Sequence, residues 1–538
     1  MKPHSDQRRA RSGGRSRSRA RPPDLPTVVL VKPPLRVPRA SYTTLACPPI
    51  SLACLAAVLR RASFPVTVVD AVGEAPTRLA PMANPKYLRV GLSDDEIVRR
   101  IPPDARLIGF TSMFSEEWPL VREVVASVRR AFPDALLVLG GEHATAAPEA
   151  CLADAAAIDL CVLGEGEATL LDLAHRVARG EDVGDVPGTA VREGAACRRN
   201  PARPRIRDLD ALPMPAWDLL PLENYLSHGL GFGLNRGPSV PLVISRGCPY
   251  DCAFCSASRM WGRRWLVRSP DNVLAEMEAM ILRYGARNFD IYDLTAIQRK
   301  DWIVEFCTKL IAKGWNISWQ IPAGTRSEVI AGDIPDLLYR SGCRYLAYAP
   351  ESGSEAVLRR VRKRLSMPGM KRSMRDALDA GVHIKCNMII GFPEETPRDY
   401  LDTVRLCVEL ALLGVHDVNI GPFCPYPGSD LFAQLAAQGR IDRLDNAFFD
   451  KLASYSDLGR TESWAERFSS RELAAMRWAA MAAFYGTSFA TRPWRLAGVI
   501  RDVATGRHNT RLARALGDIL QRYRRTLASR LSGGDGAG

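Results

Sequence analysis

Three cysteines share one short segment in the middle of the chain, Cys248, Cys252 and Cys255, with the spacing C-x3-C-x2-C. Iron–sulfur clusters are normally held by four Cys thiolates, so three thiolates on one loop would leave one iron of a four-iron cluster open to a substrate or a second cofactor. A structural zinc site needs four Cys or His ligands, usually in two pairs. No second C-x2-C pair follows, and the next such residues are Cys307 and His383. The spacing therefore favours an open, catalytic cluster site.

The remaining cysteines favour a reduced, cytoplasmic protein. The 13 cysteines are odd in number and are scattered over 538 residues, mostly in apolar runs, where a free Cys behaves as a small hydrophobic residue. The hydrophobic and charged fractions of 46% and 25% are those of an ordinary globular protein, and the length predicts two or three domains. No apolar run is long enough to predict a transmembrane helix.

The net charge of +14 is concentrated at the N-terminus, where residues 1–26 carry eight Lys or Arg against two Asp. This Arg-, Ser- and Gly-rich segment cannot bury enough apolar surface to fold, so we expect a disordered basic tail. An alternative is an arm that contacts nucleic acid or anionic membranes through charge alone. A specific nucleic-acid partner is not expected.

Residues 27–200 read as an α/β domain in which short apolar strands alternate with helices. This alternation predicts a doubly wound, flavodoxin-like parallel sheet, whose ligand should bind outside the carboxyl ends of the strands. The expected strands are 27–31, 66–70, 106–111, 135–140 and 158–163. Polar and small residues follow these strands at Pro33, Ser112, Gly140, Gly141, His143, Gly164 and Glu165.

A Pro- and Gly-rich linker is expected at 201–237, followed at 238–430 by six further strand–helix repeats. Six repeats predict a partial (β/α)6 barrel of the TIM type, with its ligands at the carboxyl ends of the strands. The expected strands are 240–245, 288–292, 317–322, 345–349, 384–390 and 417–422. Polar residues follow the strands here as well, at Asp293, Glu351, Ser352, Gly391 and Glu394.

Residues 431–538 favour a helical C-terminal domain that caps the barrel mouth. Its later part alternates Arg with Leu, which also allows contact with a membrane surface. The aromatic residues expected in its core are Trp464, Trp478, Phe484, Tyr485 and Trp494.

With Phe254 before its last Cys, the cysteine loop and the strand ends after it resemble the radical S-adenosylmethionine (SAM) superfamily over about 238–430. The resemblance implies that the three cysteines ligate a [4Fe–4S] cluster whose fourth iron is chelated by SAM. It implies that Glu351 and Ser352 contact the ribose and methionyl part of SAM, and that Gly391 and Glu394 belong to the adenine motif. Asp293 stands where the family has Gly-Gly-Glu and would meet the methionyl amine.

The strand-end motifs of 27–200 resemble the cobalamin-binding domain that precedes many radical SAM enzymes. The implied cobalamin contacts are Pro33, Ser112, Gly140, Gly141, His143, Gly164 and Glu165. The D-x-H-x-x-G motif, which supplies a cobalt-binding His in other cobalamin proteins, is absent. His143 is therefore expected to pack rather than to ligate cobalt.

The tandem order of these two domains implies a cobalamin-dependent radical SAM C-methyltransferase that acts on an unactivated carbon of a small-molecule or lipid-like intermediate. It also implies an external one-electron donor of the flavodoxin or ferredoxin type. Two alternatives remain open: a cyclase or rearrangement enzyme with the same cofactors but without methyl transfer, and a non-catalytic cobalamin sensor.

Overall fold

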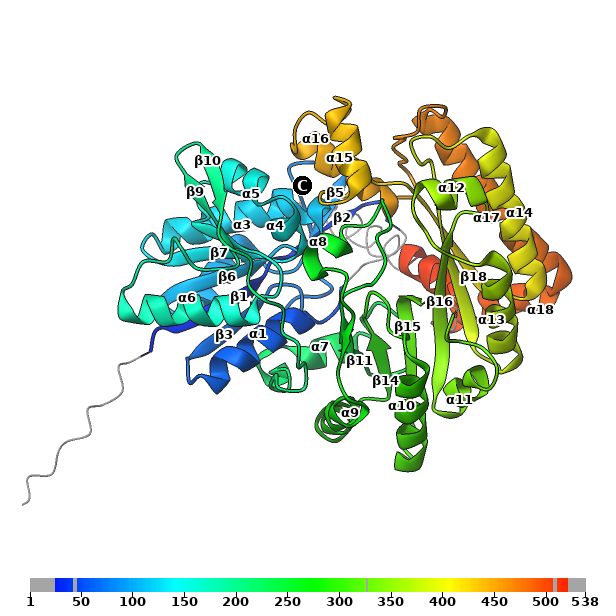
Figure 1. Cartoon of the computed structure of the whole chain (residues 1–538), viewed down its shortest axis with the longest axis horizontal. Helices are drawn as coiled ribbons and strands as arrows, with labels where there is room; N and C mark the ends of the chain where they lie inside the picture. The colour runs from blue at the N-terminus through cyan, green and yellow to red at the C-terminus, as the bar shows by residue number, and fades with distance from the viewer. Residues whose placement is uncertain (1–24, 42–45, 326–327, 507–509, 521–538) are drawn as a thin grey trace, which may run out of the picture.

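The computed structural model describes residues 25–41, 46–325, 328–506 and 510–520. The predicted basic tail lies outside these residues up to position 24. Two parallel sheets, each covered by helices, lie side by side and divide the molecule into an N-terminal and a central half (Figure 1). The coarse prediction of an α/β protein built on parallel sheets is confirmed.

The N-terminal sheet contains five parallel strands in the order β3-β1-β6-β7-β8. Their bounds are β1 Thr27–Lys32, β3 Val66–Asp70, β6 Ala105–Thr111, β7 Leu136–Gly140 and β8 Leu160–Val162. The helices that connect or follow these strands are α1 Ile50–Arg61, α2 Asp94–Arg100, α3 Trp118–Ala131, α4 Glu142–Ala146, α5 Pro148–Asp154 and α6 Glu167–Arg179. These strands are almost wholly apolar because helices bury both faces of the sheet.

Three features of this half were not predicted from the sequence. An antiparallel hairpin, β9 Thr189–Glu193 and β10 Ala196–Arg199, extends the sheet beyond β8. A separate small antiparallel sheet is formed by β2 Leu35–Pro38, β5 Tyr87–Val90 and β4 Leu79–Pro81. The 3-10 turn η1 Ser115–Glu117 precedes α3.

The central half is built on a second parallel sheet, here called the barrel sheet, whose six strands follow one another in chain order. The strands are β11 Ser239–Leu242, β14 Asn288–Ile291, β15 Ser318–Thr325, β16 Cys343–Glu351, β17 His383–Ile390 and β18 Asp417–Pro422. The helices on its outer face are α9 Pro270–Tyr284, α10 Lys300–Lys313, α11 Ile334–Arg340, α13 Met367–Asp379 and α14 Pro397–Leu413. Alternate residues of these strands point into that helix-covered core, so the others point to the inner face.

The predicted linker, 201–237, is packed against both halves. It contains the 3-10 turn η2 Trp217–Leu219 and helix α7 Leu222–Ser227. The buried Trp217 donates its indole N–H to Glu276 of α9 over 3.1 Å, whereas the buried Tyr225 donates its hydroxyl to Asp70 of β3 over 2.9 Å. The segment therefore fixes the two sheets relative to each other.

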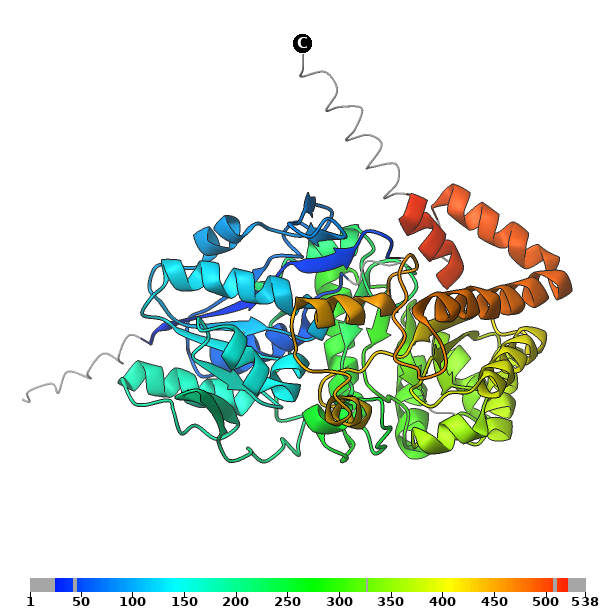
Figure 2. The same cartoon turned by 90° about the horizontal axis from the view of Figure 1, so that it is seen from above.

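The C-terminal helices serve different parts of the molecule. Helices α15 Asp430–Ala437 and α16 Asn446–Leu452 lie between the halves (Figure 1). In the view from above, the segment that contains them lies across the middle of the molecule (Figure 2). Helix α16 contacts η1 and α3, whereas α17 Ser470–Thr491 packs on α14 and β18. Helix α18 Pro493–Thr505 follows.

Of the five aromatic residues expected in the core of this region, Trp464 and Phe484 are buried, and Tyr485 is half-buried. The expectation is wrong for Trp478 and Trp494, which are 50% and 66% exposed. Both lie on surface faces of α17 and α18, where the helices have no further layer to cover them.

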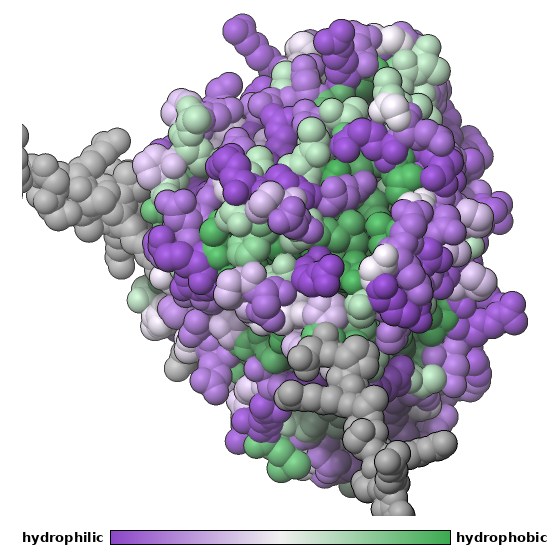
Figure 3. Space-filling model, turned by 90° about the vertical axis from the view of Figure 1, so that its left-hand side faces the viewer, coloured by the Kyte–Doolittle hydropathy of each residue, from purple (hydrophilic) through white to green (hydrophobic). Residues whose placement is uncertain are grey.

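Within the described parts of the chain, none of the helices combines the length and the apolar character needed to cross a bilayer. Seen from the side of the N-terminal half, the surface is mostly hydrophilic, with hydrophobic patches near its centre (Figure 3).

Candidate functional site

The three-cysteine loop joins the two-residue strand β12 Ser245–Arg246 to helix α8 Ala257–Trp261. Gly247 has a φ of +93°, and a Cβ at this position would lie 2.2 Å from the carbonyl oxygen of Arg264, so the turn requires glycine. The middle of the loop is pinned at Ala253. Its N–H donates to the carbonyl of Val361 over 2.9 Å, and its carbonyl accepts from Leu431 over 2.9 Å.

All three loop thiols are free and half-buried. Burial raises the pKa of Cys255 to about 12, and the nearby Glu142 and the other two sulfurs add to this effect. The thiolate at this position therefore needs a positive partner such as bound iron. Among the described residues, no three His, Cys, Asp or Glu side chains are gathered closely enough to hold a single ion. This donor set fits a cluster, in which each thiolate binds a different iron, better than a zinc ion.

Asp293 lies just after β14 and holds the strand end that leads into the cysteine loop. Its buried carboxylate accepts the backbone N–H of Ile244 over 2.9 Å and the hydroxyl of Ser245. Burial raises the pKa of Asp293 to about 7. A carboxylate offers about four acceptor positions, so Asp293 retains capacity for an amine while it orients the loop.

Glu351 and Ser352 stand together at the carboxyl end of β16 but are used differently. Glu351 has a φ of +67°, a strained conformation for a residue other than glycine, and its carboxylate pairs with Lys363 over 2.9 Å. The buried hydroxyl of Ser352 is bonded to Thr403 over 3.1 Å and accepts the N–H of Ser354 over 3.1 Å. Ser352 therefore shapes the turn, whereas Glu351 carries the charge.

The turn after β17 contains two glutamates with opposite environments. Gly391, with φ +79°, and Phe392 both donate their N–H groups to the fully buried carboxylate of Glu395, whose other oxygen has no partner among the described residues. Burial raises the pKa of Glu395 to about 7. Glu394, the predicted residue, is exposed and lies 3.9 Å from Arg360.

At the carboxyl edge of the N-terminal sheet, the chain leaves room for a ligand. A Cβ at Gly141 would lie 2.4 Å from the carbonyl oxygen of Ser112, whereas a Cβ at Gly140 would meet nothing closer than Val162 at 4.0 Å. The buried Ser112 hydroxyl has no partner among the described residues. Pro33 is also buried, directly after β1. An open glycine beside an unsatisfied hydroxyl suits a large ligand with polar groups at its rim.

His143 is enclosed rather than open to this edge. Its Nδ1 is bonded to the Ser115 hydroxyl over 2.9 Å, and its ring packs between Trp118 and Phe449 at centroid distances of 5.4 and 5.6 Å. Burial lowers the pKa of His143 to about 4, so the ring is neutral at pH 7. These contacts agree with a packing position.

The turns of the N-terminal sheet meet the cysteine loop directly. Glu165 and Glu167 both pair with Arg246, two residues before Cys248, with the first contact at 3.1 Å, and burial of this guanidinium makes the pairing strong. Glu142 accepts a hydrogen bond from the hydroxyl of Ser256, next to Cys255. The carboxyl edges of the two sheets therefore face each other across the loop.

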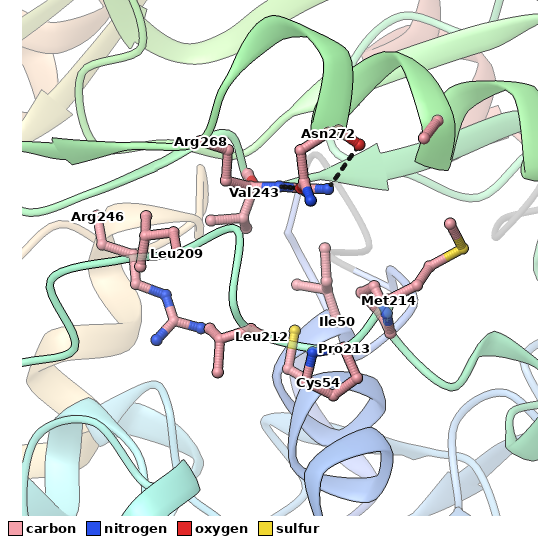
Figure 4. Close-up of a pocket in the computed structure, with 12 residues that line it drawn as sticks. Ile50, Cys54, Leu209, Leu212, Pro213, Met214, Val243, Arg246, Arg268 and Asn272 are labelled. Atoms are coloured by element: carbon pink, nitrogen blue, oxygen red, sulfur yellow. Dashed lines mark hydrogen bonds between the residues drawn. The ribbon is translucent and has the colours of Figure 1, made fainter. Parts of the chain in front are cut away.

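A cavity of about 90 Å³ opens beside Arg246 at this junction (Figure 4). It is lined mainly by apolar side chains from the start of α1, such as Ile50, and from the linker, such as Leu212 and Met214. Arg246 and Arg268 form its polar side.

Comparison with known protein families identifies the two domains that form this site. Residues 40–174 match the model of the B12 binding domain, and residues 242–407 match that of the radical SAM superfamily. The second match contains all three loop cysteines. The chain is a cobalamin-binding radical SAM enzyme. The prediction of this family and of an enzyme is thus confirmed.

Relatives of this radical SAM enzyme include methyltransferases and cyclases. An uncharacterised methyltransferase, PH0819 of Pyrococcus horikoshii, is 28% identical over 422 residues, which are 77% of this chain and 84% of the relative. The anaerobic magnesium-protoporphyrin IX monomethyl ester cyclase of Rubrivivax gelatinosus is 28% identical over 353 residues, 64% of this chain and 61% of the relative. The structure of the methyltransferase TsrM from Kitasatospora setae, with cobalamin and [4Fe-4S] cluster bound, is 19% identical and shares the fold, with a TM-score of 0.60 over 78% of this chain and 79% of that one.

The enzyme's cofactors are therefore a [4Fe–4S] cluster, SAM and cobalamin, as predicted. The chemistry of the donor set fits the cluster on the cysteine loop, and the open edge at Ser112 and Gly140 fits cobalamin. The structure brings Asp293 to the strand end that leads into the cysteine loop, and it brings Glu165 against that loop. It leaves Glu394 at the surface and His143 enclosed.

Four residues that organise the site were missed from the sequence: Glu142, Arg246, Lys363 and Glu395. Glu142 and Arg246 stand beside residues that were singled out, but their partners lie 114 and 81 positions away in the chain. Glu395 follows Glu394 directly, and only burial distinguishes the two.

Proposed function

We propose that this enzyme is a C-methyltransferase that adds a methyl group to an unactivated carbon of a small-molecule or lipid-like biosynthetic intermediate. The observation that carries the proposal is the direct contact between the two carboxyl edges. Glu142 and Glu165 of the cobalamin edge hold Ser256 and Arg246 of the cluster loop, so a methyl donor bound at one edge lies beside a substrate activated at the other.

When bound, the three cofactors supply one-electron reduction, abstraction of a hydrogen atom and a transferable methyl group. The chain's own residues hold and enclose them. Cys248, Cys252 and Cys255 would hold the cluster, and Glu351 and Asp293 would position the methionyl end of SAM. The Gly391 turn, shaped by Glu395, would receive the adenine, with Glu394 at its rim.

On the cobalamin side, Ser112 and the backbone at Gly140, Gly141 and Gly164 would contact the macrocycle, with Pro33 behind it. Water is kept from the junction by aromatic packing, since Phe254 of the cysteine loop lies against Phe392 at a centroid distance of 5.8 Å. His143 would support this edge through packing.

The test is anaerobic turnover with SAM labelled in its methyl group, supplied with candidate substrates and a reductant. We expect labelled product together with deoxyadenosine. Deoxyadenosine without label in any product would overturn methyl transfer.

A second candidate, a cobalamin-dependent cyclase or rearrangement enzyme, is favoured by the likeness to the magnesium-protoporphyrin cyclase. The same turnover separates the two, because a cyclase forms deoxyadenosine and a product that gains no methyl carbon.

The finer description of the enzyme belongs to this proposal. We describe the N-terminal sheet as flavodoxin-like and the barrel sheet as a partial (β/α)6 barrel, and we expect a cytoplasmic protein. The sequence has one cysteine motif for a cluster, so an external donor of the flavodoxin or ferredoxin type would supply the electron. Contact of the basic C-terminal helices with a membrane surface would bring a lipid-like substrate within reach.

A further inference from the structure

The inner face of the barrel sheet carries polar side chains below the cofactor site. In β17, Ile384, Cys386 and Met388 point outward into the helix-covered core, so Lys385 and Asn387 point inward. Higher on the same inner face, Ile389 packs in the same apolar cluster as Phe254 of the cysteine loop. The inner column of β17 therefore runs from the cluster loop down to Lys385.

Lys385 is buried without a partner. Its residue is 6% exposed, and its ammonium forms no hydrogen bond or ion pair with the described residues, but this nitrogen is not one of the fully enclosed polar atoms that lack a partner. Buried charges are otherwise paired in proteins, because an unpaired one costs several kcal/mol. The carboxylate of Asp417 acts on Lys385 through its charge but forms no ion pair with it, so the lysine can still bind a second, closer anion.

The nearest acid, Asp417, is already engaged. It lies opposite Lys385 in the neighbouring strand, but its carboxylate accepts the N–H groups of Arg511 and Leu512 at 2.9 and 3.1 Å and the hydroxyl of Tyr485 at 3.3 Å. Asp417 therefore anchors the start of helix 511–520, and it offsets the charge of Lys385 without forming an ion pair with it.

Two neighbours on the inner face also lack partners among the described residues. Tyr345 is 2% exposed and lies two residues before Ala347, which pairs with Lys385 across the sheet, and its hydroxyl forms no hydrogen bond with the described residues. Asn387 is half-buried, and its amide is likewise unbonded. An ammonium, a phenol and an amide together can donate several hydrogen bonds to one acceptor group.

By contrast, the polar groups around Asp290 and Arg514, a region here called the barrel floor, all have hydrogen-bond partners. Asp290 accepts from Gln320 over 2.6 Å and from the N–H of Gly233 over 3.1 Å. Arg514 of helix 511–520 donates to the carbonyls of Gly231, over 2.9 Å, and Gly233. Unpartnered groups are thus concentrated just above a closed floor.

We propose that Lys385, with the hydroxyl of Tyr345 and the amide of Asn387, binds an anionic group of the substrate, a carboxylate or a phosphate. This inference rests on the proposed function, because it names the substrate class of the same site. Lys385 precedes Gly391 by six residues, about 20 Å along a strand. The substrate therefore extends from the cofactors toward the floor and presents its anionic end there.

The charges around Lys385 support this reading. Burial, together with the smaller effect of Arg511, lowers the pKa of Lys385 to about 7 against the opposing effect of Asp417. The other titratable groups around Lys385 and Asp417 are Tyr345 on β16, Tyr485 on α17 and Arg514 on helix 511–520, and Asp290 on β14 lies near Arg514. A bound anion would favour the protonated amine, so binding should take up a proton near pH 7.

The experiment measures binding of three probes to the full-length, anaerobically reconstituted enzyme by calorimetry: hexanoate, hexyl phosphate and hexanol. We expect at least one anion to bind ten-fold or more tightly than hexanol, and the better anion identifies the group. In Lys385→Met, this preference should fall to two-fold or less. Lys313→Met is the matched control, since Lys313 is on the outer helix α10 and pairs with Glu278 at the surface, and it should keep the full preference.

Equal binding of all three probes to the wild type, or an unchanged preference in Lys385→Met, would overturn the inference. Lys385→Arg retains the positive charge and should retain the preference. If the Met variant does not fold, the wild-type comparison and Tyr345→Phe decide, and the latter should weaken anion binding several-fold.

A second readout does not depend on turnover. Trace acetylation of Lys385 by acetic anhydride, followed by mass spectrometry from pH 6 to 9, should fall when hexyl phosphate is bound, because the amine then holds its proton. Protection of Lys385 without label transfer would remove the proposed function but keep the anion site, whereas label transfer without protection would do the reverse.

Discussion

Helices cover both faces of the N-terminal sheet but only the outer face of the barrel sheet, whose inner face is polar. In the N-terminal sheet, residues 28–31 of β1 are all apolar and buried, because helices cover both sides. In the barrel sheet, the outer residues of β17 are apolar, whereas Lys385 and Asn387 point inward. A parallel sheet is normally apolar on both faces, so a polar inner face indicates a ligand. The first sheet offers only its edge to a cofactor, and the second offers its edge and its interior.

The largest loss of activity should come from removing the cluster ligands of the barrel half while leaving the N-terminal sheet intact. Replacing Cys248, Cys252 and Cys255 by Ala should remove the cluster signal in visible and electron-resonance spectra and reduce deoxyadenosine formation to background. Cobalamin binding, measured by its absorbance after gel filtration, should persist because Ser112 and the glycine edge are untouched. Loss of both cofactors would show that the two edges form one inseparable site.

Arg246 tests how strongly the two edges are joined. Arg246→Met leaves the buried Glu167 without its ion-pair partner and leaves Glu165 with only Arg205, at 3.4 Å, which should cost about 3–5 kcal/mol in the free energy of unfolding. Chemical denaturation of the apoprotein measures this. As a control, Arg299→Met removes an exposed pair with Asp301 and should change stability by less than about 1 kcal/mol. Equal effects of the two substitutions would contradict the buried bridge.

His143 tests the packed character of the N-terminal sheet through pH. Its pKa is about 4 in the folded protein and about 6.5 when unfolded, so the unfolded chain binds the extra proton as the pH falls from 6.5 to 4. The wild type should lose about 3 kcal/mol of stability over this window from His143 alone. His143→Gln should lack this component in urea unfolding at pH 7, 5.5 and 4.5.

The control for this pH series is His228→Gln, at an exposed histidine, which should follow the wild type. An identical pH dependence of His143→Gln and the wild type would mean that His143 is accessible to protons in the folded state. Such a result would reopen its role as a cobalt ligand.

The smallest effect separates the two glutamates after β17. Glu395→Ala leaves the N–H groups of Gly391 and Phe392 without their acceptor and should cost about 2 kcal/mol, with weaker SAM binding. Glu394→Ala removes only a surface contact and should cost less than about 1 kcal/mol. Calorimetry of SAM binding and thermal melts check both, and a larger loss of SAM affinity in Glu394→Ala would return the adenine role to that residue.

Elements with strong local patterns could be predicted closely from the sequence. Strands β3 and β18 have the predicted bounds, because short apolar runs set them locally. The hairpin β9–β10 was missed because its strands are only five and four residues long and end in exposed charged residues.

The parts of the site that depend on residue type, such as the three cysteines, could be predicted from the sequence. The parts that depend on ion pairs between residues far apart in the chain could not. The bond between Arg246 and Glu165 joins residues 81 positions apart, and no local signal specifies it. Lys385 interrupts an apolar strand, and only the fold shows that it points inward and lacks a counter-ion among the described residues.

The contacts of Arg514 bear on how the protein is made. This side chain reaches the backbone of Gly231 and Gly233, 283 and 281 positions earlier. Because domains fold largely in order during synthesis, the N-terminal sheet can form while the ribosome is still translating the barrel. The barrel floor, however, stays open until Arg514 has left the exit tunnel, so a stalled or prematurely ended chain would expose a polar, unsealed interior to proteases.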